Sequence, residues 1–197
     1  SHIATTLVRA GIGEIWLIDR DIVELDNLQR QILFDEDDAR AHTPKAIAAA
    51  AHLRKANSAC TIHPIIDDFS ASSFAQLGGR PDVILDGTDN FATRFLLNDL
   101  SLREDIPWIY GGVLGAAGTA MAILPGESPC LRCMTPEPHP TGELGNCETH
   151  GVLASAVATI AAFQSAQALK ILAGRPGDVA RGILTIDVWE NVYALRM

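Results

Sequence analysis

Short apolar runs alternate with helix-like segments over the first 110 residues, and this alternation limits the fold more than any other feature of the chain. The runs are four to six residues long and are typical of buried parallel strands, whereas the segments between them are long enough to form helices. Strands that alternate with helices in this way form a parallel sheet with helices on both faces. The predicted strands are 14–18, 61–66, 82–86 and 107–110, and the predicted helices are 45–57, 70–77 and 90–104.

The pattern changes after Gly118. Three further segments are predicted to form antiparallel strands: 119–124, 183–188 and 192–196. They flank a long, Ala-rich helix predicted at 151–173, which follows a loop, 125–150, that contains Pro, Gly and Cys. The uninterrupted apolar part of the helix is shorter than the roughly 20 residues that cross a bilayer, so we expect a buried helix and no membrane partner. The fold class is therefore predicted as α/β: a Rossmann-like, largely parallel sheet flanked by helices, with antiparallel strands in the C-terminal part.

Composition narrows the domain count and the classes of partner. With 197 residues, 48% of them hydrophobic, the chain can bury one substantial core, and a single domain is expected over residues 1–197. Fifteen basic residues against twenty-four acidic ones give a formal charge of −9, and no basic run with interleaved aromatic residues is present, so no nucleic-acid partner is expected. Four cysteines without an apolar signal segment indicate reduced thiols and a cytoplasmic location.

Acidic residues follow the first predicted strand. Asp19 and Asp21 stand directly after the apolar run 14–18. In a nucleotide-binding βαβ unit, an acidic residue at this position accepts hydrogen bonds from ribose hydroxyls, about twenty residues after a Gly-rich phosphate loop. That loop would have to precede Ser1, so the chain carries half of the fingerprint. A solvated acidic strand end is the alternative interpretation.

A polar segment and a lysine come next along the chain. The segment contains Asn27, Arg30 and Gln31, and Lys45 follows at the start of a predicted helix. Arginine binds phosphoryl oxygens through a planar fork and lysine binds them as a point charge. A cation at a helix N-terminus opposes the helix dipole, and a phosphate partner would explain the position of Lys45. The alternative is that each is an ordinary surface charge.

A second acidic cluster, 86–90, follows the strand 82–86. Ligands of open parallel sheets bind outside the carboxyl ends of the strands, where a carboxylate can hold Mg²⁺ against ATP phosphates. Asp89 is the better metal candidate, because Asp86 ends the strand and is expected to point into the sheet. The alternative is a helix N-cap formed by Thr88 or Asp89, and both interpretations can hold together.

The four cysteines suggest two kinds of chemistry. Cys130 and Cys133 have the spacing of half a structural zinc site, and a tetrahedral site needs two more ligands. Cys60 and Cys147 stand alone. Cys147 lies in a loop ahead of the long helix, where a thiol with a lowered pKa can react as a thiolate. An inert cysteine is the alternative.

Taken together, the order and spacing of these motifs resemble the ThiF/MoeB/HesA family, relatives of the ubiquitin-activating enzymes, essentially from end to end. The segments that carry the resemblance are 17–24 (LIDRDIVE), 27–31 (NLQRQ), 44–45 (PK), 85–90 (LDGTDN), 129–133 (PCLRC), Cys147 with 151–153 (GVL), and 164–174 (QSAQALKILAG).

The resemblance implies a homodimeric adenylyltransferase that uses ATP and Mg²⁺. Its substrate would be the C-terminal glycine carboxylate of a ubiquitin-like sulfur carrier protein ending in Gly-Gly, of the ThiS or MoaD type, in thiamin or molybdopterin biosynthesis. The implied roles are ribose binding for Asp19, phosphate binding for Arg30 and Lys45, magnesium binding for Asp89, and further polar contacts from Asp21, Asn27, Gln31 and Asn90. Cys147 matches a loop cysteine that some members use in a later sulfur-transfer step.

The sequence departs from the family pattern at both ends. The Gly-rich nucleotide loop and an upstream arginine would precede Ser1, and the second cysteine pair would follow Met197. Zinc binding by Cys130 and Cys133 is therefore expected to be incomplete, and this stretch alone is expected to be unable to bind ATP. The segment 40–45 also replaces a shorter, Gly-containing stretch, which makes the placement of Lys45 less certain. Three other functions stay open: adenylation of a different carboxylate such as a peptide terminus, a non-catalytic scaffold that binds a ubiquitin-like protein, and an NAD-dependent oxidoreductase that would explain Asp19 alone.

Overall fold

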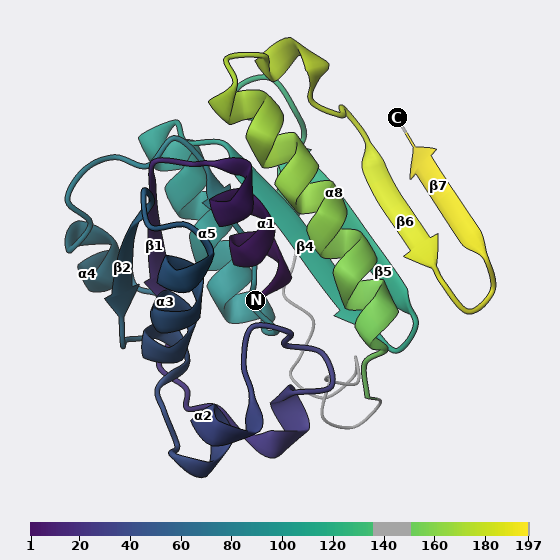
Figure 1. The fold of residues 1–197 in the computed structure, drawn as a ribbon. Coiled ribbons are helices and arrows are strands. Elements are labelled where there is room, and N and C mark those ends of the chain that lie inside the picture. Colours follow the sequence, from purple (N-terminus) through teal and green to yellow (C-terminus); the bar gives the residue numbers. More distant parts are fainter. Residues whose placement is uncertain (136–150, 197) are drawn as a thin grey trace. The chain divides into compact units, whose positions relative to one another are not determined.

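The computed structural model describes residues 1–135 and 151–196, and the chain divides into two compact units, Ser1–Arg80 and Pro81–Met197 (Figure 1). Each unit has its own sheet and its own buried clusters. They are described in turn, and the single domain expected for the whole chain stays a prediction.

The first unit is built on two parallel strands. Its elements are α1 (His2–Ala10), β1 (Glu14–Ile18), the 3₁₀ turn η1 (Leu25–Asn27), α2 (Glu36–Arg40), α3 (Lys45–Ala56), β2 (Thr61–Ile65) and α4 (Ala71–Ala75). Strands β1 and β2 pair in register from Glu14 with Thr61 to Ile18 with Ile65. Both α1 and α3 contribute to one buried cluster with β2, formed by Val8, Ala50, Leu53, Cys60 and Ile62. The helices therefore cover one face of this sheet, as expected for a βαβ unit.

The second unit holds a five-stranded mixed sheet in the order β3-β4-β5-β6-β7. Its elements are β3 (Ile84–Leu85), α5 (Phe91–Glu104), β4 (Trp108–Leu114), β5 (Ala117–Ile123), α6 (Leu131–Met134), α8 (Ala154–Leu172), the 3₁₀ turn η2 (Pro176–Asp178), β6 (Ile183–Asp187) and β7 (Val192–Arg196). The pair β3–β4 is parallel and the other three pairs are antiparallel. Helix α8 lies along β4 and β5 (Figure 1), and its Ile160 is buried with Ala120 and Ile186.

The predicted α/β class is confirmed, with a parallel pair in the first unit and antiparallel strands in the C-terminal part. Among the described strands, parallel pairing is confined to β1–β2 and β3–β4. The strand predicted at 82–86 is reduced to two residues, and the helix predicted at 70–77 extends over five. The long apolar segment is a helix, as expected, and none of the described helices is long and apolar enough to cross a membrane.

The largest difference lies in β4, which continues to Leu114 although the sequence prediction ends it at Tyr110. Two glycines, Gly111 and Gly112, follow Tyr110, and glycine weakens a strand. In the structure, a Cβ atom at Gly111 would lie 2.5 Å from Cδ of Gln164, so the missing side chain allows α8 to approach the sheet. The strand then turns into β5 through Gly115, whose φ of +58° favours glycine.

Candidate functional site

In the first unit, an ionic cluster forms where β1 ends. The backbone amide of Asp21 donates to Oδ1 of Asp19 at 2.9 Å, and Nζ of Lys45 lies 3.1 Å from Oδ2 of Asp21. The backbone amide of Lys45 also donates to the carbonyl of Asp21 at 2.8 Å. Asp19, Asp21 and Lys45, three residues predicted to bind the nucleotide, therefore lie together.

Lys45 is the first residue of α3, as predicted. The side chain of Lys45 is 12% exposed, whereas that of Asp21 is 56% exposed. A carboxylate beside a helix N-terminus stabilises the positive end of the helix dipole and also offsets the lysine charge. In the structure, Asp21 thus supplies the anionic partner for which the sequence analysis had suggested a phosphate.

Burial controls the protonation of Asp19. Removal from water raises the pKa of Asp19 above its usual value, and the hydrogen bond from the Asp21 amide and the nearby charge of Lys45 partly oppose the rise. The carboxylate accepts one backbone hydrogen bond and is half-buried. It retains acceptor capacity of the kind that a ribose hydroxyl would use.

The polar segment after η1 has two distinct roles. Asn27 is buried, and its side chain accepts from the Glu24 amide at 3.2 Å and donates to Asp26 at 2.8 Å, so it closes the local turn. Arg30 and Gln31 are half-buried, and their backbone amides both donate to the carbonyl of Asn27. An NH1 group of Arg30 donates to the Asp26 carbonyl at 3.0 Å. Asn27 therefore fixes the turn that carries Arg30 and Gln31.

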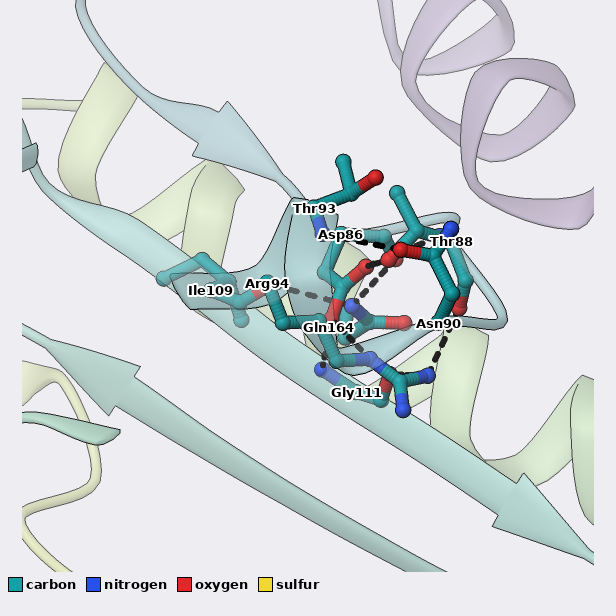
Figure 2. Close-up of polar contacts among 8 residues, drawn as sticks. All are labelled: Asp86, Thr88, Asn90, Thr93, Arg94, Ile109, Gly111 and Gln164. Atoms are coloured by element: carbon teal, nitrogen blue, oxygen red, sulfur yellow. Dashed lines mark hydrogen bonds and ion pairs between the residues drawn. The ribbon is translucent and has the colours of Figure 1, made fainter. Parts of the chain in front are cut away.

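In the second unit, a buried ion pair follows β3 (Figure 2). Asp86 is 2% exposed, and its Oδ2 accepts from Nε of Arg94 at 3.1 Å. Its Oδ1 accepts from both the amide and the hydroxyl of Thr88, at 2.8 and 2.7 Å. Burial raises the pKa of Asp86, and the charge of Arg94 and the donors of Thr88 oppose that rise. As predicted, Asp86 points inward and leaves Asp89 as the exposed carboxylate of this loop.

The N-cap of α5 differs from the prediction. Thr88 or Asp89 was predicted as the cap, but the cap is Asn90, whose Oδ1 accepts from the Thr93 amide at 2.8 Å. Thr88 is drawn away from that position by its two hydrogen bonds to Asp86. The carboxylate of Asp89 makes no hydrogen bond within the described part of the chain, so it is free to take a ligand there.

Two residues of this network were not assigned from the sequence. Arg94 lies on the buried face of α5 with Leu97, Asn98 and Ser101, at helical spacing, and polar residues on such a face are the signal that could have identified it. Gln164 is buried on α8, and its Nε2 donates to the carbonyls of Asp86 and Ile109 at 2.9 and 3.0 Å.

Two of the predicted zinc ligands lie side by side. The Sγ atoms of Cys130 and Cys133 are 3.8 Å apart, at the start of α6. Two thiolates at about 2.3 Å from a tetrahedral zinc ion are separated by roughly this distance. Cys147 falls outside the described residues. Cys60 is buried in the first unit, where burial raises the pKa of its thiol, so it is not a reactive cysteine.

A third group of potential metal ligands was not predicted. Asp35, Asp38 and His52 place one ligand atom each within 4.8 Å of one another. Asp35 caps α2 by accepting from the amides of Asp37 and Asp38. Asp38 accepts from the Asp35 amide and lies 2.7 Å from the imidazole of His52. These hydrogen bonds explain the cluster as the cap of α2 and its link to α3.

The predicted site residues therefore form two groups, one in each unit. Asp19, Asp21, Asn27, Arg30, Gln31 and Lys45 belong to the first, and Asp89, Asn90, Cys130 and Cys133 belong to the second. That the two groups face one nucleotide stays a prediction.

Comparison with known proteins identifies the family. The model of the ThiF family matches residues 1–196. The chain is 39% identical over 188 residues to the sulfur carrier protein ThiS adenylyltransferase of Bacillus subtilis, covering 95% of this chain and 55% of that protein. It is 37% identical over 187 residues to the SAMP-activating enzyme E1 of Haloferax volcanii, covering 95% and 68%.

The fold is also found in solved structures. E. coli MccB with ATP aligns with a TM-score of 0.80 at 23% identity, over 99% of this chain and 59% of MccB. The chain thus spans little more than half the length of the Bacillus subtilis relative and of MccB. Since the family model covers all but the last residue, the chain belongs to the ThiF family.

Proposed function

We propose that this chain is the adenylation core of an ATP-dependent adenylyltransferase that activates the C-terminal glycine carboxylate of a ubiquitin-like sulfur carrier protein. The observation that carries the proposal is the family match over residues 1–196, with relatives named as activators of ThiS and SAMP. Cationic and acidic side chains suited to the reaction are present in the two groups described above.

The proposed reaction needs positioning and charge neutralisation rather than a protein nucleophile. A carboxylate oxygen of the carrier attacks the α-phosphorus of ATP, the bond from that phosphorus to the bridging oxygen breaks, and pyrophosphate leaves. Negative charge builds on the phosphoryl oxygens, and preorganised cations stabilise it. Lys45 and Arg30 supply that charge in the proposal, and Asp19 orients the ribose. Asp21, Asn27 and Gln31 shape the polar surroundings, with Asn90 in the second group.

Asp89 fits the role of a magnesium ligand because it is an exposed carboxylate at the carboxyl end of a strand, and hard cations prefer oxygen ligands. Magnesium would neutralise charge on the phosphates. Cys130 and Cys133 fit half of a structural zinc site by their 3.8 Å separation, and the remaining ligands would come from elsewhere in the full-length protein. A homodimer, a cytoplasmic location, a reactive Cys147 and service in thiamin or molybdopterin synthesis stay predictions.

The test is carrier-dependent exchange of labelled pyrophosphate into ATP by the full-length protein. We expect exchange only with a carrier that ends in Gly-Gly, and none with the same carrier lacking those glycines. Exchange with a peptide terminus instead would favour the alternative substrate, and carrier binding without exchange would favour the scaffold. Either result would refute the proposal.

Asp89→Ala tests the assignment of the metal ligand. Loss of an electrostatic stabiliser of the transferred phosphoryl group should lower exchange roughly 100-fold or more, with an unchanged circular dichroism spectrum. Asp82→Ala is the matched control, because Asp82 is an exposed aspartate that precedes the same strand rather than following it. Exchange at the wild-type rate in Asp89→Ala would remove Asp89 from the magnesium site.

A further inference from the structure

Hydrogen bonds at both ends hold the loop 86–90, which carries Asp89. Of its residues, Gly87 is exposed and lacks a side chain, whereas Thr88 is fixed by the two hydrogen bonds to Asp86. Asn90 is fixed at the other end, as the N-cap of α5. Asp89 itself stands between these two anchors, so its position depends on them.

Arg94 joins the carboxylate of Asp86 to two backbone carbonyls through one side chain (Figure 2). Its Nε donates to Oδ2 of Asp86 at 3.1 Å, and its NH2 group donates to the carbonyl of Thr88 at 2.6 Å and to that of Gly111 at 3.3 Å. The loop is thereby tied to both β3 and β4. A planar guanidinium can satisfy several acceptors in a fixed geometry, which a lysine ammonium cannot reproduce.

The surroundings of Arg94 restrict it to this role. Its side chain is 9% exposed, and its guanidinium carbon lies 5.3 Å from the ring centre of Phe91 and 5.5 Å from that of Tyr110. Gln164 of α8 donates to the carbonyls of Asp86 and Ile109 beside this pair. The buried ion pair is therefore held by several hydrogen bonds and two ring contacts, as a rigid support for an exposed ligand requires.

We propose that Arg94 is a positioning residue for the adenylation reaction, acting through Asp86 and Thr88 to hold Asp89 where it meets the magnesium ion. The inference rests on the proposed function of the site. In this proposal, Arg94 contacts neither the metal ion nor the substrate. Its contribution is to order the loop before the metal arrives, so that binding does not have to supply the ordering free energy.

This role predicts a selective defect. If the loop loses its anchor, the magnesium ion must order the loop on binding, and the half-saturating magnesium concentration rises. The KM for the carrier should not change, because Asp86 and Arg94 are buried and offer the carrier no contact surface. If Arg94 were merely structural, replacing it would instead lower the amount of folded protein. The half-saturating magnesium concentration and the KM for the carrier would both stay unchanged.

The test uses the full-length protein and two pairs of variants. Arg94→Lys keeps the charge and loses the fork, and Arg103→Lys, an exposed arginine on the same helix, is its control. Thr88→Val removes the hydroxyl bond to Asp86 at equal size. Thr93→Val, one turn into α5, is the control for it.

Two measurements are made on each variant. The first is the magnesium dependence of pyrophosphate exchange, for which we expect the half-saturating concentration to rise about 10-fold in Arg94→Lys and about 3-fold in Thr88→Val, corresponding to the loss of one or two buried hydrogen bonds. The second is amide hydrogen exchange by NMR without ligands. The amide of residue 88 should exchange about 10-fold faster in Arg94→Lys, while the Ile106 amide beyond the end of α5 stays at the wild-type rate.

The outcomes separate this inference from the proposed function. Absence of pyrophosphate exchange in the wild-type protein would refute the proposed function and, with it, the role of Arg94. The inference alone would be refuted if the wild-type protein catalyses pyrophosphate exchange but neither Arg94→Lys nor Thr88→Val changes the magnesium dependence or the amide protection. Should Arg94→Lys fail to fold, Thr88→Val still decides, because it removes a single hydroxyl.

Discussion

Gly111→Ala is the substitution whose effect the structure defines most closely. A Cβ atom at this position would lie 2.5 Å from Cδ of Gln164, about 1 Å inside the normal carbon separation of about 3.5–4.0 Å. The three nearest atoms all belong to the amide of Gln164. Gly111 is not among the glycines with positive φ, so the effect arises from this contact rather than from backbone strain.

The magnitude follows from the hydrogen bonds that the Gln164 amide makes. If the Gln164 amide is displaced, the Ile109 carbonyl keeps one donor, the Asp86 amide at 3.0 Å. The Asp86 carbonyl has no other donor in the described residues and is left unpaired. One unpaired buried carbonyl costs about 1–3 kcal/mol, and overpacking costs about 1–3 kcal/mol. The strand preference of Ala over Gly returns roughly 0.5–1 kcal/mol. The net loss of unfolding free energy is about 1–5 kcal/mol.

Thermal unfolding followed by circular dichroism measures the loss. We expect Tm to fall by roughly 3–15 °C, since 1 kcal/mol corresponds to about 2–4 °C at this chain length. Gly177→Ala is the control, because a Cβ atom there meets nothing within 4 Å. Its Tm should stay near that of the wild type.

A double-mutant cycle tests the cause. Gln164→Ala removes the colliding amide, so Gly111→Ala should be nearly neutral in that background, and the two changes should couple by more than about 1 kcal/mol. If the two effects add to within about 0.5 kcal/mol, the contact between Gly111 and Gln164 is not the reason for the glycine.

Two further predictions concern a core residue and a surface ion pair. Leu53→Ala, at a fully buried position of the first unit, should lower the free energy of unfolding measured in urea by about 2–5 kcal/mol. Leu25→Ala, at a 66% exposed position, should change that free energy little. Equal losses in the two variants would contradict the assigned core. The hydrogen bond from Arg132 lowers the pKa of Asp99, so this pair adds stability above the ordinary pKa of an aspartate, and the contribution is lost as pH falls through the lowered value. Because both side chains are about half exposed, the gap in stability between wild type and Arg132→Met should be small at pH 6 and should narrow by pH 3. A gap that widened on acidification would refute this explanation.

Much of the fold could be predicted because its signals are local. Apolar runs of strand length at 14–18 and 61–66 became β1 and β2, and the helix of the long apolar segment became α8. Lys45 begins α3 as expected. The cap of α5 was placed one or two residues too early, because the competition for Thr88 comes from Asp86 and only the folded chain brings the two into contact.

The site divides in the same way. Asp19 and Asp89 were predicted as site residues from their positions after strands, which a linear sequence shows directly. Arg94 and Gln164 were not assigned, since their partners lie up to 78 residues away along the chain. No local pattern tells a buried arginine from an exposed one unless the face of its helix is known.

The sequence by itself determined the α/β class, the family, and the residue types available for nucleotide chemistry, because periodicity and motif order are properties of neighbouring residues. The tertiary structure alone decided which polar residues face inward: Asp86 pairs with Arg94, Gln164 reaches two carbonyls, and Gly111 makes room for it. The physical reason is that a buried charge or amide persists only where the packed chain supplies its partners.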